Sequence, residues 1–334
     1  MQNGTETKMM EQLVDELLKK LQEANQIEEL EFHKRPDDDC FLSNYIIAKK
    51  YSELRKAKII LTNAGRKSSE ESNPSRVSMD IGGGPYDHHV KGFGRKTSAD
   101  LVAERLGLLN DPGLQPLLAM VRKVDNAEKL FEDSIHFVIE GLPRKYHKNG
   151  DVDWTQVRDK TFELFDSVYD QAVLKAQSAR DLKEYAIWVS LSNRIKICKI
   201  LWHPELRDAA FDAGASVVFW TKARGKNTFW ANLSTNRELS NFRLNRVSEE
   251  LKKAEAKKRG ISTDGLNLLF PGQTPPIPGW YLGNNGRFLM CGSRTNPISN
   301  EECTKLTPSE IEGIIEKTLS FIPKQIVDSW GKKS

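Results

Sequence analysis

The pattern of apolar and polar positions divides the chain into two regions that differ in their predicted secondary structure. Between residues 29 and 81, short apolar runs at 29–33, 57–63 and 76–81 have the length of buried strands, and residues 40–56 have a helical period. Strands that alternate with helices indicate a parallel sheet, whose functional loops follow the carboxyl ends of the strands.

Helical patterns precede and follow these strands. An amphipathic stretch at residues 6–24 predicts a helix that docks on the first domain. Residues 96–107 predict a helix that Thr97 or Ser98 caps and Gly107 ends. Residues 113–131 and 155–184 continue as helices, with a surface loop expected at 142–154.

From about residue 186 the chain becomes rich in β-branched and aromatic residues, which predicts strands. Asn284, Asn285 and Gly286 form a good hairpin turn, and helices are expected at 204–213, 244–259 and 308–320. The predicted fold is α/β, with a parallel-sheet first domain and a smaller mixed α/β second domain. The expected division is an N-terminal helix at 1–27, a first domain at 28–184 and a second at 185–334.

Composition narrows the class of protein. The chain has 334 residues, which favours two domains, and its 38% apolar content is enough for ordinary cores. A net charge of +4 permits a local basic groove but does not demand one. The four cysteines are far apart, which argues against a disulfide framework and a structural zinc site.

No apolar run reaches the length of about 18 residues that suggests a membrane span, and the N-terminus carries acidic residues unlike a signal peptide. We therefore expect a cytoplasmic protein with no membrane partner, as a monomer or a homodimer.

Acidic and imidazole side chains gather where the predicted strands end. The candidate metal ligands are His33, Asp37, Asp39, Asp80, His88 and Asp125, and the tripeptide that contains His88 begins with Asp87 and ends with His89. Carboxylates combined with imidazoles suit Mn²⁺, Mg²⁺ or Fe²⁺ better than zinc. The alternative interpretation is a capped turn with hydrogen-bonded loop histidines, and Asp125 could instead form an ion pair with Arg122 or Lys129.

These motifs resemble those of the DHH phosphoesterase superfamily, which includes single-strand exonucleases, oligoribonucleases, cyclic-dinucleotide phosphodiesterases and manganese-dependent pyrophosphatases. The family's first motif, close to H-x-N-P-D-x-D, is matched by residues 33–39 (HKRPDDD), with Arg35 in place of the asparagine. Asp80 matches the aspartate at a strand end, residues 87–89 the DHH tripeptide, and Asp125 the fourth motif. The resemblance covers about residues 28–130.

The resemblance implies a catalytic site with two divalent cations, Mn²⁺ by preference. His33, Asp37 and Asp80 would hold one cation, and Asp39, Asp80, His88 and Asp125 the other, with Asp80 bridging. His89 would face the substrate phosphate, and Asp87 would orient a neighbouring histidine. Two cations about 3.5–4 Å apart can stabilise the in-line displacement at phosphorus.

The second half of the chain resembles the family less. It lacks a clear glycine-rich GGR..GG motif and the Ser-Arg-Lys signature of the pyrophosphatases, and residues 291–297 (CGSRTNP) are the nearest match. Gly292, Ser293 and Arg294 are therefore candidate phosphate contacts. The glycines at 82–84 lack the G-K-[ST] of a P-loop, and we interpret them as flexible backbone before the DHH tripeptide.

Basic and aromatic residues interleave between residues 219 and 246. Lys222 and Arg224 are the candidate substrate contacts in this stretch, where aromatic side chains could stack on bases. The alternative is that the aromatic residues pack the second core and the cations are solvated.

The sequence therefore predicts a metal-dependent hydrolase, an exonuclease acting on single-stranded RNA, DNA or short oligonucleotides. One alternative is a hydrolase of pyrophosphate, nucleotides or cyclic dinucleotides. The other is an inactive nucleic-acid-binding module, which the intact set of acids and histidines disfavours.

Overall fold

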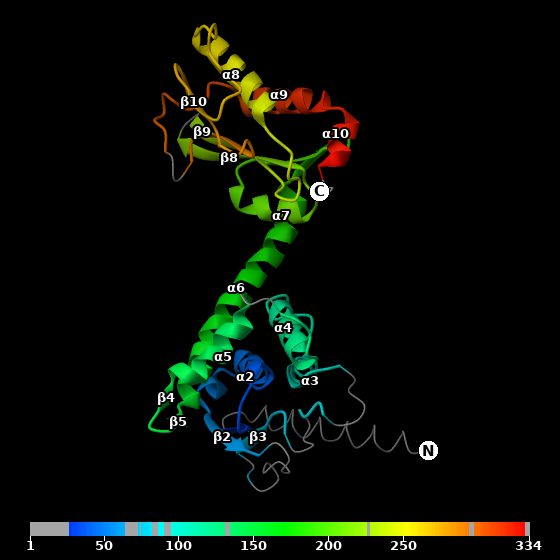
Figure 1. The fold of residues 1–334 in the computed structure, drawn as a ribbon, viewed down its shortest axis with the longest axis vertical. Coiled ribbons are helices and arrows are strands. Elements are labelled where there is room, and N and C mark those ends of the chain that lie inside the picture. The colour runs from blue at the N-terminus through cyan, green and yellow to red at the C-terminus, as the bar shows by residue number, and fades with distance from the viewer. Residues whose placement is uncertain are drawn as a thin grey trace, which may run out of the picture. The chain divides into compact units, whose positions relative to one another are not determined.

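A computed structural model describes residues 27–63, 73, 75–81, 86–89, 95–130, 134–225, 228–293 and 297–330. The chain divides into two compact units, residues 1–174 and 175–334 (Figure 1). The boundary falls within the 32-residue helix α6 (Trp154–Tyr185). The helix expected at 6–24 and the glycines at 82–84 lie outside the described residues.

The first unit contains a parallel sheet of three described strands. β1 (Glu29–His33) lies between β2 (Lys58–Thr62) and β3 (Arg76–Ser78) and is parallel to both. Leu30, Phe32 and Val77 are fully buried, as their apolar runs predict. Because the strands are parallel, the residues that follow their carboxyl ends meet at one edge of the sheet.

Helices cover this sheet and fill the first core. They are α2 (Asp38–Lys50), the 3₁₀ turn η2 (Ser52–Lys56), α3 (Ser98–Arg105), α4 (Gln115–Asp125), α5 (Ile135–Lys145) and the first part of α6. Tyr45 of α2 meets Phe162 and Phe165 of α6 edge to face, with ring centroids 5.4 and 5.5 Å apart. Truncating such a buried aromatic costs about 3–5 kcal/mol, so α6 is tightly bound to this core.

The loop prediction for residues 142–154 is wrong. Helix α5 continues to Lys145, and β4 (His147–Lys148) and β5 (Asp151–Val152) form a short hairpin. Asn149 and Gly150 both have positive φ, as a two-residue hairpin turn requires. Their Asn-Gly dipeptide was the signal for this turn.

The second unit contains one mixed sheet of seven described strands in the order β10-β11-β12-β9-β8-β7-β6. The strands are β6 (Ile187–Ser190), β7 (Lys196–Ile200), β8 (Val217–Gly225), β9 (Thr228–Thr235), β10 (Gly272–Thr274), β11 (Ile277–Leu282) and β12 (Phe288–Cys291). β7 and β8 are parallel and the other pairs antiparallel. The predicted α/β class, with a parallel sheet followed by a mixed one, is confirmed.

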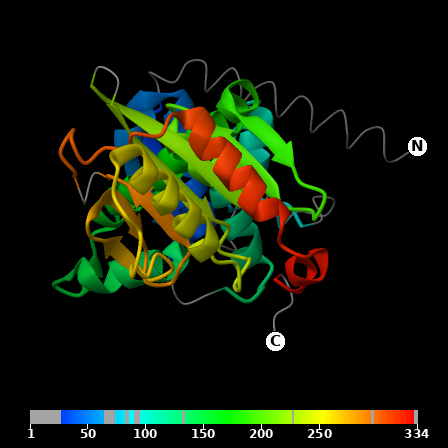
Figure 2. The ribbon, with the colours of Figure 1, turned by 90° about the horizontal axis from the view of Figure 1, so that it is seen from above.

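Helices pack on both faces of this sheet. α8 (Asn245–Arg259) and α9 (Pro308–Ser320) lie side by side on one face (Figure 2), where they enclose the main core of the unit. The turn η4 (Pro204–Leu206) and α7 (Arg207–Asp212) pack on the other face, against β7 and β8. α10 (Lys324–Ser329) follows α9. Among the described residues, no helix has the length and apolar character that crossing a bilayer requires.

Candidate metal centre

The candidate ligands converge at the carboxyl edge of the parallel sheet. His33 is the last residue of β1, and Asp37 is the N-cap of α2, whose first turn contains Asp39. The Oδ1 atom of Asp37 accepts the backbone N–H groups of Asp39 and Cys40 at 3.0 and 3.1 Å. The capping bonds therefore fix the backbone of the first motif.

Asp80 follows β3 in an unusual backbone conformation. Its φ is +56°, in the left-handed region that aspartate and asparagine tolerate better than most residues. The Asp80 N–H donates to the carbonyl of Tyr86 at 3.3 Å. The Ser98 hydroxyl lies 2.5 Å from that carbonyl and 3.1 Å from Asp80 Oδ1. Ser98 thus links α3 to Asp80, a role that the sequence did not reveal.

Asp39 is buried against the N-terminus of α3. Its two carboxylate oxygens accept the backbone N–H groups of Ser98 and Ala99, both at 2.8 Å. Thr97 caps this helix in a capping box with Asp100. Burial, followed by repulsion from Asp80 and Asp37, nevertheless raises the pKa of Asp39 to about 8. The basic group that faces it is the imidazole of His88, whose Nε2 lies 3.8 Å from Asp39 Oδ2.

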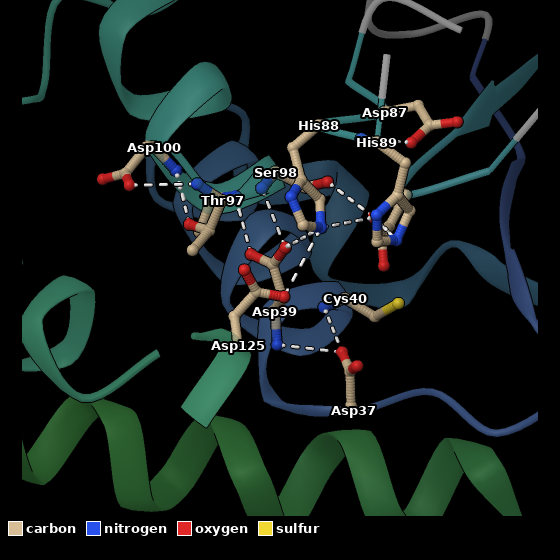
Figure 3. Close-up of polar contacts among 12 residues, drawn as sticks. Asp37, Asp39, Cys40, Asp87, His88, His89, Thr97, Ser98, Asp100 and Asp125 are labelled. Carbon is tan, nitrogen blue, oxygen red and sulfur yellow. Dashed lines mark hydrogen bonds and ion pairs between the residues drawn. The ribbon is translucent and has the colours of Figure 1, made fainter. Parts of the chain in front are cut away.

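His88 lies among three carboxylates (Figure 3). Its Nε2 atom is 3.2 Å from Asp80 Oδ1, 3.5 Å from Asp125 Oδ1 and 3.8 Å from Asp39 Oδ2. This nitrogen is buried and makes no hydrogen bond with the described residues. The carboxylates, Asp80 foremost, raise the pKa of His88 to about 9. A divalent cation between these groups would take the place of the histidine proton.

A second set of ligand atoms adjoins the first. His33 Nε2 lies 3.6 Å from both Asp37 Oδ2 and Asp80 Oδ2. The interaction with Asp37 raises the pKa of His33, although the partial burial of His33 acts in the opposite direction. Burial alone would raise the pKa of Asp37, but its bonds with His33 and the backbone of Cys40 lower it.

Cys40 belongs to this second set and was missed by sequence reasoning. Its Sγ atom lies within 4.8 Å of a ligand atom of each of His33, Asp37 and Asp80. Burial and the nearby carboxylates raise the pKa of the thiol well above its ordinary value, so it is a neutral neighbour. The signal in the sequence was its spacing, because Cys40 is one helical turn after Asp37.

His89 and Asp87 complete the tripeptide. His89 is exposed, and its Nε2 lies 3.7 Å from Asp80 Oδ1, where a substrate phosphate could reach it. Its ring lies 4.1 Å from that of His88, centroid to centroid. Asp87 is buried and accepts the backbone N–H of His89 at 2.9 Å, so it orients this turn of the chain.

Together the residues fit a pair of divalent cations. One set contains His33, Asp37 and Asp80, and the other contains Asp39, His88 and Asp125, with Asp80 reaching both. A cation would bind the buried Nε2 atom of His88 together with the carboxylates around it, and it would offset the repulsion among the acids. Oxygen and imidazole donors suit Mn²⁺, Mg²⁺ or Fe²⁺. Asp125 does not pair with Arg122, which instead binds Asp100.

The structure adds a supporting pair behind α2. His136 of α5 lies with its Nδ1 atom 2.6 Å from the carboxylate of Asp38, between the two ligands of the first motif. Burial raises the pKa of Asp38 to about 6. This pair connects α5 to the ligand-bearing turn, and no local pattern predicts that His136 would reach it.

The candidate substrate contacts of the second unit surround one indole. Arg224 lies over the ring of Trp230 with its guanidinium 4.7 Å from the ring centre, and Lys222 is the register partner of Trp230. Gly292 is also in contact with this ring, and Ser293 follows it. Arg294 lies outside the described residues.

Comparisons with known proteins add a structural likeness. No family model matches the chain, and no curated protein matches it. Among solved structures, a protein described as a member of the s1p family of ribosomal proteins, DHH domain, matches with a TM-score of 0.31 at 10% identity. The match covers 95% of this chain and 92% of that one. The chain is thus similar to a DHH-domain protein.

Proposed function

We propose that the chain is a metal-dependent phosphoesterase that hydrolyses phosphodiester bonds, acting as an exonuclease on single-stranded RNA, DNA or short oligonucleotides. The observation that carries the proposal is the buried, hydrogen-bond-free Nε2 of His88 among the carboxylates of Asp39, Asp80 and Asp125. Such a nitrogen is stabilised by a cation, and paired cations are typical of phosphoryl-transfer sites.

His33, Asp37 and Asp80 would hold one cation, and Asp39, Asp80, His88 and Asp125 the second. When bound, such cations neutralise charge on phosphoryl oxygens and lower the pKa of a water molecule. The α3 N-terminus holds Asp39 in place through two backbone N–H groups, and Asp37 is held by its capping bonds. The imidazole of His89 is exposed beside Asp80 and would donate a hydrogen bond to the substrate phosphate.

An end-label assay tests the proposal. Single-stranded RNA and DNA labelled at either end are incubated with the protein in Mn²⁺, beside His88→Ala and a control, His147→Ala, which removes an exposed histidine from the β4–β5 hairpin. We expect mononucleotides or a ladder with the wild type and the control, but not with His88→Ala.

The pattern of end-labelled products gives the direction of cleavage. Cleavage that persists in His88→Ala would contradict the metal assignment. Intact oligonucleotides together with hydrolysis of pyrophosphate or a cyclic dinucleotide would instead assign the site to small substrates.

A further inference from the structure

The two faces of the second sheet carry different side chains. Leu233, Leu289 and Trp280 point to α8 and α9 and are buried in the main core. Residues one position away in each strand point to the opposite face, because side chains alternate along a strand. We call this opposite face the strand-binding face; it is formed by Lys222, Arg224, Tyr281, Phe288 and Met290 around the buried side chains of Trp230, which also contacts the main core, and Asn232.

In the part of the chain that the structure describes, no helix covers the strand-binding face in the way that α8 and α9 cover the other. The cluster beneath α7 includes residues of β7 and β8, with none from β9, β11 or β12. Tyr281, Phe288 and Met290 are accordingly only half-buried. Tyr281 and Phe288 stack with their ring centroids 6.2 Å apart and their planes 27° apart. Two aromatic rings are therefore accessible on a sheet surface.

Two cations lie on the same face without an acidic partner. Lys222 and Arg224 are exposed, and neither takes part in an ion pair among the described residues. The segments β8, β9, β11 and β12 contain no aspartate or glutamate. The face therefore has net positive charge, which favours an anionic ligand.

The indole between these groups is built into the face. Trp230 is 7% exposed, and its Nε1 atom is buried with no hydrogen-bond acceptor among the described residues. Gly292 has φ +79°, and a Cβ there would lie 2.2 Å from Trp230 Cδ1. Only glycine therefore allows the indole its position, and the indole in turn supports the guanidinium of Arg224.

We propose that the strand-binding face binds an unpaired nucleic-acid strand, with Lys222 and Arg224 on the phosphates and the rings of Tyr281 and Phe288 against the bases. The inference deepens the proposed function, on which its link to hydrolysis rests. Sheets that bind single strands combine aromatic rings that stack on bases with cations that follow the backbone. From β8 to β11 the face crosses four strands, roughly 14 Å at the usual strand spacing, which is room for more than one nucleotide.

Binding is tested apart from cleavage, with the full-length protein in EDTA and fluorescein-labelled 12-nucleotide RNA and DNA read by anisotropy. Lys222→Ala/Arg224→Ala is expected to raise Kd at least about tenfold and to reduce the slope of log K against log salt by about 1.4, since each neutralised phosphate contributes about 0.7 for a single strand. The control Lys183→Ala/Lys257→Ala removes the same charge from exposed positions elsewhere in the unit. It should change Kd less than about twofold.

A second variant separates stacking from charge. Tyr281→Leu keeps an apolar side chain but loses the ring, and it should raise Kd about fivefold or more, because stacking contributes about 1–3 kcal/mol per base. The salt dependence should stay that of the wild type.

The possible results of these experiments distinguish failure of the inference from failure of the proposed function. Equal losses in the Lys222/Arg224 and control variants overturn the inference, as does binding of polyglutamate as tight as that of the oligonucleotides. A wild type that binds no strand but hydrolyses a small phosphodiester overturns the inference and leaves the metal centre standing. Binding that depends on Lys222, Arg224 and Tyr281 without any hydrolysis in Mn²⁺ supports the inference and contradicts the proposed function.

Discussion

Each unit buries an acid, Glu255 in the second and Asp39 in the first, but the two acids have different surroundings. Glu255 of α8 accepts hydrogen bonds at 2.6 Å from Arg259 Nε and from the Thr304 hydroxyl, and others from Trp280 Nε1 and the backbone N–H of Lys305. Asp39 of α2 is held by backbone groups, and its nearest charged neighbours include Asp80 and Asp37.

The difference in surroundings indicates that Glu255 is a structural acid and that Asp39 is a metal ligand. A buried charge is tolerated when donors and an opposite charge surround it, as at Glu255. Where acids face one another, as Asp39, Asp80 and Asp37 do, the protein retains an unfavourable arrangement, which the raised pKa of Asp39 reflects. Such arrangements are typical of functional sites. The comparison predicts opposite results when one charge is removed from each cluster.

The largest effect is expected from Asp80→Asn. Asparagine tolerates the positive φ of this position, so the backbone is preserved while one carboxylate shared by both ligand sets is lost. We expect Mn²⁺ binding to disappear by calorimetry and hydrolysis to fall roughly a thousandfold or more, since bound cations contribute several kcal/mol to the transition state.

The metal-free Asp80→Asn protein loses both the repulsion between Asp80 and Asp39 and the ion pair between Asp80 and His88, so its stability in urea should stay within about 1 kcal/mol of the wild type. The control Asp151→Asn, at an exposed hairpin position, should change neither property. A stability loss of several kcal/mol in Asp80→Asn would show that Asp80 is structural after all.

The opposite result is expected from Glu255→Gln. The amide cannot satisfy all four donors and leaves Arg259 without its buried counter-charge, so the free energy of unfolding should fall by about 3 kcal/mol or more. Urea denaturation measures this loss, and Mn²⁺ binding to the folded protein should be unchanged. Glu250→Gln, which removes an exposed partner of Lys253, should cost less than about 1 kcal/mol.

Much of the first unit could be predicted from the sequence because its signals are local. The apolar runs predict β1 and β2, and Asp37 and Thr97 are placed by capping rules that involve residues two or three positions away. The convergence of His33, Asp80 and His88 followed from one rule, since the ends of parallel strands share an edge.

Contacts between distant segments were not predictable in this way. Ser98 is read from the sequence as a helix cap, and only the packing of α3 against α2 places its hydroxyl beside Asp80. The same holds for His136 and Asp38, 98 residues apart. In the second unit, the alternation of residues 219–246 did not reveal which cations share a face with Tyr281, because strand order sets that face.

The smallest predicted effect concerns Lys252, one turn before Glu255 on the same helix. Lys252 is fully buried, and its ammonium donates to the Thr274 hydroxyl at 2.9 Å, with no carboxylate partner among the described residues. Burial lowers its pKa from 10.5 to about 8. Like Asp39, it is a buried ionisable group whose pKa burial shifts toward the neutral form.

The direction of the pH dependence follows from that lowered pKa. Between pH 8 and 10.5 the unfolded chain keeps the lysine proton and the folded chain loses it, so the unfolded state binds more protons and stability rises with pH. From pH 7.5 to 9.5 the gain from Lys252 should be about 1–2 kcal/mol, measured by urea denaturation. Lys252→Met should lack this part of the slope, while Lys257→Met, at an exposed position of α8, should retain it. Equal slopes in Lys252→Met and the wild type would mean that Lys252 stays charged in the folded protein, and then the contrast between satisfied and unsatisfied buried charges would apply to the acids alone.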